Sequence, residues 1–114
     1  MARMRTNYTP DIEAQVTFLA TEDGGRIGPV STGYRGDFYV RGNNYVAVHE
    51  YPDVESVNPG QTARVVLRVL RPHLVAPVLV VNEEFEIREA TRTVARGRVT
   101  KLVDLAKHAD EYVP

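Results

Sequence analysis

Cysteine is absent from the sequence, which excludes disulfide bonds, thiol catalysis and metal sites built on thiolates. Long hydrophobic runs are absent too, and none approaches the roughly 18 consecutive apolar residues of a membrane-spanning helix. The first residues, Met-Ala-Arg-Met-Arg, lack the apolar stretch of a signal peptide. Together these absences predict a cytoplasmic protein that does not insert into a membrane.

An excess of one charge is also missing, because 14 Lys and Arg residues stand against 15 Asp and Glu residues, for a net charge of −1. Strong nucleic-acid binders usually have a high pI and a one-sided basic surface, so the overall charge argues against one. Lysine is scarce, and 12 of the 14 basic residues are arginine. The planar arginine head suits bidentate contacts to phosphate or carboxylate, although genome base composition would produce the same bias.

Motifs for catalysis or cofactor binding are missing as well. The three histidines, His49, His73 and His108, have no close spacing that would place two metal ligands on one face of an element. The acidic run at 83–89 alternates with apolar residues and is interpreted as a solvated strand face. No phosphate-binding Gly-x-x-x-x-Gly-Lys motif occurs. We therefore expect no enzyme activity, no metal and no cofactor.

Short strands account for most of what the sequence contains. The chain is 43% hydrophobic and 25% charged, which is typical of a globular protein, and its 114 residues fit one domain. Alternation of apolar and polar residues, or β-branched and aromatic runs, predict strands over 12–20, 37–41, 45–51, 63–69, 78–81, 85–88 and 94–103. Turn signals such as Gly42-Asn43-Asn44 and Asn58-Pro59-Gly60 separate them. The pattern predicts an all-β barrel or sandwich.

Three finer expectations concern the remaining segments. Gly97 marks a bulge or a close approach within the last strand. The stretch from Pro72 to Pro77 is too short and too broken for a helix. Residues 104–111 form either one short helix or a frayed end. The predicted domain organisation is a flexible arm over 1–10, a folded β-barrel domain over 11–104 and a C-terminal tail over 105–114.

Three ordered sequence blocks resemble a known family. They are Glu-Asp-Gly-Gly-Arg at 22–26, Gly-Tyr-Arg-x-x-Phe at 33–38 and Arg-Glu-x-x-Arg-Thr-Val beginning at 88. Together they look like the third, C-terminal domain of elongation factor Tu, over about residues 12–102. The resemblance implies a six-stranded antiparallel β-barrel that holds the T-stem backbone of aminoacyl-tRNA and contacts other domains and exchange factors. Nucleotide chemistry belongs to a different domain of that factor, so we expect no GTP binding.

Arginines at turns and strand ends are the candidate binding residues, because they can reach outward to phosphates. Arg92 lies at such a turn and begins a patch that Arg96 and Arg98 can extend along one strand face. Tyr34 precedes Arg35 and is a candidate for stacking on a base, whereas Tyr39 is more typical of a core position.

The resemblance selects four positions of this chain. It places Arg26, Arg35 and Glu89 at the RNA-facing edge, and Arg71 where a basic or polar residue is usual. Asp37 and the pair Ala90-Thr91 depart from the family pattern, which has Gln and Gly-Gly at these positions. The first change brings a negative charge near the expected phosphate, and the second hinders close approach of the backbone. The predicted RNA-binding edge is therefore partly preserved.

Three hypotheses follow. The first is a non-enzymatic binding module that engages a protein partner linked to translation, or a second copy of itself. The alternative is a weak, salt-dependent tRNA or rRNA binder that acts through its arginine-lined edge. An enzyme assembled from scattered residues is the hypothesis that the sequence favours least. A homodimer is expected if apolar surface remains where other domains dock in the related factor.

Overall fold

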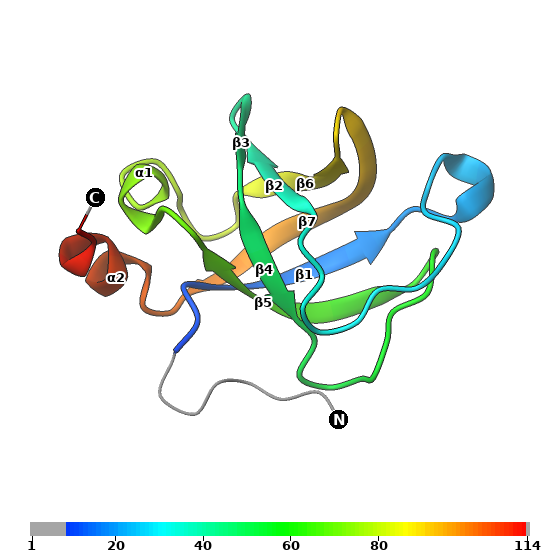
Figure 1. Cartoon of the computed structure of the whole chain (residues 1–114), viewed down its shortest axis with the longest axis horizontal. Helices are drawn as coiled ribbons and strands as arrows, with labels where there is room; N and C mark the ends of the chain where they lie inside the picture. The colour runs from blue at the N-terminus through cyan, green and yellow to red at the C-terminus, as the bar shows by residue number, and fades with distance from the viewer. Residues whose placement is uncertain (1–8, 114) are drawn as a thin grey trace.

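The fold is a strongly curled antiparallel sheet, seen in a computed structural model that describes residues 9–113 (Figure 1). Its strands follow one another in space as β3-β2-β6-β7-β1-β5-β4. Their bounds are β1 Ile12–Phe18, β2 Asp37–Val40, β3 Asn43–Tyr45, β4 Ala47–Glu50, β5 Thr62–Val69, β6 Glu84–Glu89 and β7 Arg92–Leu102. The predicted arm at 1–10 falls almost wholly outside the described residues.

The sheet closes on itself through the segment that contains β3 and β4. β3 pairs with β2, whereas β4 pairs with β5 at the other end of the sheet, and only Val46 separates the two strands along the chain. The backbone amide of His49 also donates to the carbonyl of Tyr34 at 2.9 Å, which continues the β2–β3 register. β3 and β4 are therefore two parts of one strand, and the predicted six-stranded antiparallel barrel is confirmed.

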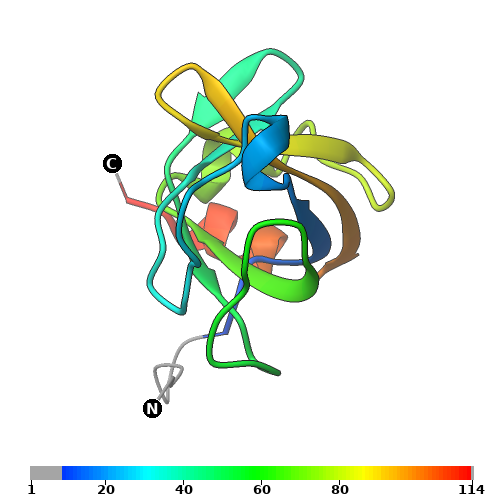
Figure 2. The ribbon, with the colours of Figure 1, turned by 90° about the vertical axis from the view of Figure 1, so that its right-hand side faces the viewer.

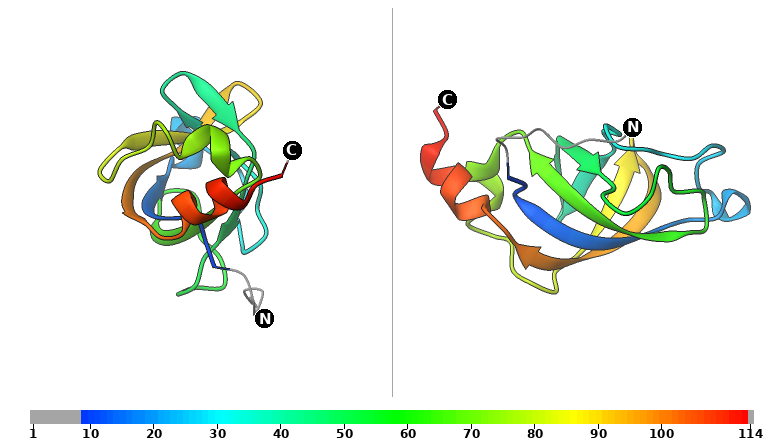
Figure 3. Two further views of the ribbon diagram at one scale, coloured as in Figure 1. Left: turned by 90° about the vertical axis from the view of Figure 1, so that its left-hand side faces the viewer. Right: turned by 90° about the horizontal axis from the view of Figure 1, so that it is seen from below.

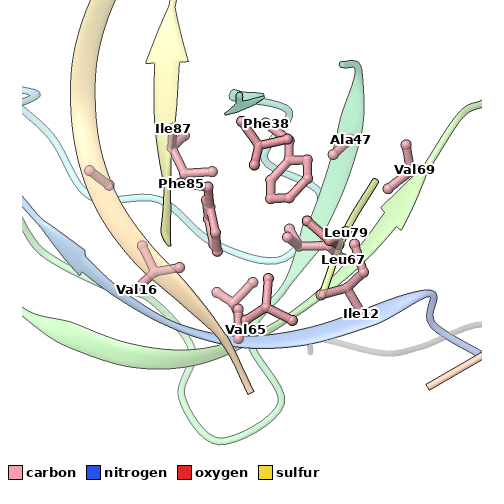
Figure 4. Close-up of a cluster of buried hydrophobic side chains, with 14 of the residues drawn as sticks. Ile12, Val16, Phe38, Ala47, Val65, Leu67, Val69, Leu79, Phe85 and Ile87 are labelled. Atoms are coloured by element: carbon pink, nitrogen blue, oxygen red, sulfur yellow. The ribbon is translucent and has the colours of Figure 1, made fainter. Parts of the chain in front are cut away.

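Alternating side chains fill the inside of the barrel (Figure 4). In β1 the buried residues Ile12, Ala14, Val16 and Phe18 follow the predicted period of two. Phe85 and Ile87 of β6 face the same interior, as predicted, and Gly97 of β7 lies against Phe85. A Cβ atom at Gly97 would lie only 2.5 Å from the Phe85 ring, so the predicted close approach is correct.

The turn between β2 and β3 is tighter than predicted. Val40 pairs with Asn43, so the loop consists of Arg41 and Gly42 alone. Both residues have positive φ, 51° and 83°, as a two-residue type I′ hairpin requires. The predicted hairpin is confirmed, with its loop shifted toward Arg41.

The segment after β5 differs from the prediction. Pro72–Val75 form a one-turn helix, α1, because proline at the first helical position lacks only an amide that would have no partner there. The predicted strand over 78–81 is wrong. Its buried residue, Leu79, follows buried Val75 by four positions and donates its amide to the Val75 carbonyl at 3.1 Å. Helical spacing, rather than alternation, explains this burial.

Helices cover one end of the barrel and a loop covers the other. The open choice for residues 104–111 is settled in favour of a helix, α2 Leu105–Glu111, which packs on α1 across the barrel end (Figure 3). The opposite end carries a 3-10 turn, η1 Thr21–Asp23, beside the hairpin that joins β6 and β7 (Figure 2). Neither described helix is long and apolar enough to cross a membrane.

Two side-chain contacts anchor α2. The buried Asp11 carboxylate lies 2.5 Å from Nδ1 of His108 and accepts the Val69 amide at 2.7 Å. Burial raises the pKa of Asp11, against the hydrogen bonds from His108 and Val69 that lower it. His73 of α1 stacks on Tyr112, with ring centroids 4.0 Å apart and planes at 18°. The C-terminal helix is thus fixed to both β1 and α1.

Candidate binding surfaces

The first candidate surface is a cluster at the η1 end of the barrel, centred on Glu89. Tyr34 donates its hydroxyl to Oε2 of Glu89 at 2.6 Å, and the Arg26 guanidinium forms an ion pair with the same oxygen. Arg26 also donates to the carbonyl of Gly28 and lies 5.1 Å from the centre of the Tyr34 ring. The structure therefore brings together three residues that the sequence placed at one edge.

Internal pairing offsets the charge of Arg26 in this cluster. Burial alone would raise the pKa of Glu89, but the hydrogen bonds from Tyr34 and Arg26 outweigh burial and lower it. Burial raises the pKa of Tyr34 well above its ordinary value, and the hydrogen bond to Glu89 adds to the rise. Glu89 thus stays ionised, and the Arg26 charge is matched within the protein before any ligand arrives.

Tyr34 is held between this cluster and the core. Its ring makes edge contacts with Phe18 at 6.2 Å and with His49 at 5.0 Å between ring centres. Its hydroxyl is occupied by Glu89. A ring packed in this way presents little face to a ligand, so stacking of a base on Tyr34 is not supported by the geometry.

A bulge separates the arginines of β7. The register shifts between Ile87 and Arg88, so that Arg92 pairs with Glu89 whereas Arg96 pairs with Glu86. Residues 86 and 89 are three apart on a strand and point to opposite faces, which sends Arg92 and Arg96 to different surfaces. Arg92 contacts Glu89 at 3.6 Å. The predicted continuous patch from Arg92 to Arg98 is therefore divided.

A second surface is a polar groove on the outside of the barrel, with a volume of about 550 Å³. Its lining includes Arg96 and Arg98 of β7, Glu84 of β6, and Arg41. Arg98 pairs with Glu84 at 3.4 Å, and Arg41 pairs with Glu83 at 2.9 Å. Tyr39, expected in the core, lies on this outer side, half-buried beneath the Arg88 guanidinium at 3.5 Å from the ring centre.

Arg35 and Arg71 lie apart from the Glu89 cluster in different ways. Arg35 is exposed next to Tyr34, with no ion pair to any residue of 9–113. Arg71 directly precedes α1, at the end of the long axis opposite η1 (Figure 1). Of the six candidates, the structure joins Arg26, Tyr34, Glu89 and Arg92, leaves Arg35 as their exposed neighbour and separates Arg71.

A third surface, which the sequence did not indicate, is an apolar groove beside α1, again with a volume of about 550 Å³. Its lining consists of Asn43, Asn44, Tyr45, Val46, Leu70, Arg71 and Leu74. Val46, Leu70 and Leu74 are 44%, 50% and 45% exposed. The sequence contains one sign of this groove, because Leu70 continues the outward-facing positions of β5 that Arg64, Val66 and Arg68 occupy.

No metal cluster forms among residues 9–113.

A comparison with known protein families matches residues 6–103 to the elongation factor Tu C-terminal domain. The chain belongs to this family. The match spans every strand of the elongation factor Tu-like barrel and α1, and it ends before α2 begins at Leu105. This domain has no catalytic role in the family. The resemblance seen in the three sequence blocks is thereby confirmed, and the apolar groove beside α1 lies within the matched region.

Proposed function

We propose that this barrel is a non-enzymatic protein-binding module, with a partner linked to translation. The observation that carries the proposal is that most of its arginines are already paired with carboxylates of the same chain. Ten arginines lie between residues 9 and 113, and seven of them form ion pairs with carboxylates of the same chain. The three others are Arg35, Arg71 and Arg96. They belong to three different parts of the surface.

Internal ion pairs weaken the case for RNA as the main ligand. A phosphate that approaches Arg26 must compete with Glu89, which is already held by two hydrogen bonds. Phosphate contacts supply most of the affinity of proteins for nucleic acids, and each contact requires an available cation. Three dispersed arginines, together with Lys101 and Lys107, provide few such contacts, so an RNA complex would be weak, with a shallow dependence on salt concentration.

Exposed apolar surface favours a protein partner. Tyr45, Val46, Leu70 and Leu74 gather around one groove, with Arg71 at its rim. Aromatic and arginine side chains are enriched at the centre of protein–protein interfaces, which is also more apolar than the rest of the surface. The groove therefore provides an apolar surface on which a protein partner can bind.

Copurification from native extract with and without nuclease tests the proposal. We expect the tagged chain to retain a specific protein partner after nuclease treatment, and Leu74→Asp to release that partner, because a carboxylate would disrupt the apolar groove. Ile27→Asp is the matched control, since Ile27 is 91% exposed and does not line the groove.

Recovery of nucleic acid alone would count against the proposal. In that case Arg35→Ala should abolish most of the binding, because Arg35 is the exposed arginine of the predicted edge that has no carboxylate partner within residues 9–113. Arg64→Ala is the corresponding control, because Arg64 is committed to Asp53 through two hydrogen bonds of 3.0 Å.

A further inference from the structure

The groove beside α1 is lined by a single charged side chain. Arg71 is the one charged residue of its lining, and no carboxylate shares the groove with it. Arg71 is exposed and forms no ion pair within residues 9–113. A ligand that fills this groove must therefore combine apolar side chains with a negative charge placed beside Arg71.

The chain itself carries a segment of this composition. Asp110 and Glu111 are exposed at the end of α2 and make no ion pair within the described residues, and Val113 is 84% exposed. Both carboxylates stand in the last helical turn, where the partial negative charge of the helix end disfavours them. A cation from outside the helix would relieve this repulsion.

The groove and the acidic segment both adjoin α1. Leu74 of α1 lines the groove, while His73, one residue earlier, stacks on Tyr112 between the acidic pair and Val113. Figure 1 shows α1 between the C-terminal helix and the β2–β3 hairpin, whose residues form the far wall of the groove. A twofold axis near α1 would bring the acidic segment of each copy to the groove of the other.

We infer that a second copy of this chain occupies the groove, with Asp110 and Glu111 beside Arg71 and Val113 against Leu70 and Leu74. The interface is isologous, so each dimer contains this contact twice. The inference rests on the proposed function, because it names the protein partner as the chain itself. Apolar contacts supply most of the affinity, and the charges fix the orientation of the two copies.

Light scattering over a wide range of concentrations tests the dimer. The full wild-type chain should change from monomer to dimer as its concentration rises. Leu74→Asp and Arg71→Glu should each raise the dimer Kd roughly tenfold or more, as expected for loss of an anchor at the centre of an interface. Ile27→Asp, which changes an exposed residue outside the contact, should leave the Kd unchanged.

Mixing two variants gives the sharpest test of orientation. Arg71→Glu alone, and the double variant Asp110→Lys with Glu111→Lys, should each dimerise poorly because like charges meet at both contacts. An equimolar mixture should form a heterodimer with a Kd near the wild-type value, since both contacts then join opposite charges. Circular dichroism of each variant establishes that it is folded.

Three results would overturn the inference: a wild-type chain that stays monomeric, a dimer indifferent to Leu74→Asp, or a mixture that fails to associate. A monomeric wild type that still retains a different protein after nuclease treatment would assign the groove to that partner. It would refute self-association and leave the proposed function standing. Failure of both experiments would refute both.

Discussion

At the scale of single residues, His49 shows how the barrel accommodates a buried polar side chain. His49 is fully buried and hydrogen-bonds the Gly36 carbonyl through Nε2 at 2.9 Å, while its Nδ1 lies 3.2 Å from the Tyr51 hydroxyl. Because a carbonyl only accepts, Nε2 carries the proton and Nδ1 accepts from Tyr51. The neutral ring satisfies both of its nitrogens.

Protonation of His49 should destabilise the fold. Burial lowers its pKa from 6.5 to about 4, so the unfolded chain binds this proton more tightly than the folded chain does. His49 therefore costs no stability above pH 6.5, and stability falls as the pH drops from there toward 4. The loss at the lower limit is on the order of 3 kcal/mol. Chemical denaturation at a series of pH values measures it.

His49→Gln is the matched variant, because glutamine keeps a polar group but does not titrate. We expect it to be less stable than the wild type at neutral pH and to have a flatter dependence between pH 6.5 and 4. An unchanged slope in this variant would show that other groups control the acid response.

At the scale of elements, alternation predicted the strands well where one face is buried. β1 and β5 are neighbours in the sheet, and their apolar parity is clear in the sequence. The predictions that failed concern segments that do not pack as regularly alternating strands. α1 contributes Val75 to the core from a single helical turn, which is too short to show a period. The division of the β7 arginines depends on a bulge that alternation alone cannot place.

Gly97 is the element-scale position where a small change should have a large effect. Its missing side chain makes room for the Phe85 ring, and a Cβ atom would also approach Val16 to 2.9 Å. We expect Gly97→Ala to destabilise the barrel by about 1–3 kcal/mol through overpacking. Thermal and denaturant unfolding measure the change.

Gly28→Ala is the control for this prediction, because nothing lies within 4 Å of a Cβ atom at that position. It should leave stability nearly unchanged. Adding Phe85→Leu to Gly97→Ala should recover part of the loss, since the smaller side chain leaves the interior space that the new methyl group needs. Equal effects of the two glycine substitutions would refute the packing explanation.

At the scale of the whole molecule, the sequence identified the candidate binding residues better than it predicted their roles. Arg26 and Glu89 are 63 residues apart, and nothing in either block shows that one neutralises the other. The family resemblance placed both at one edge, and the structure shows this edge as an internal ion-pair cluster. The groove beside α1 combines residues from β3, the end of β5 and α1, so only the folded chain assembles it.

Salt dependence provides a prediction for the whole surface. Among residues 9–113, five basic residues form no ion pair with a carboxylate: Arg35, Arg71, Arg96, Lys101 and Lys107. If the chain binds duplex RNA through them, about five counterions are released at most, and the plot of log K against log salt should have a slope no steeper than about −4.5. Fluorescence anisotropy with labelled RNA measures this slope. A much steeper slope would show that ion pairs such as Arg26–Glu89 open on binding.

The closed circuit of strands has a consequence for any partner. Sheet proteins with a free edge can recruit a strand from another chain, which binds mainly through main-chain hydrogen bonds. Here the two ends of the sheet order, β3 and β4, are joined through Val46, so the described sheet leaves only short outer edges, on β3 and on residues 62–65 of β5. Recognition should then depend mainly on side chains, and the amino-acid sequence of a partner should matter more than its ability to adopt an extended backbone.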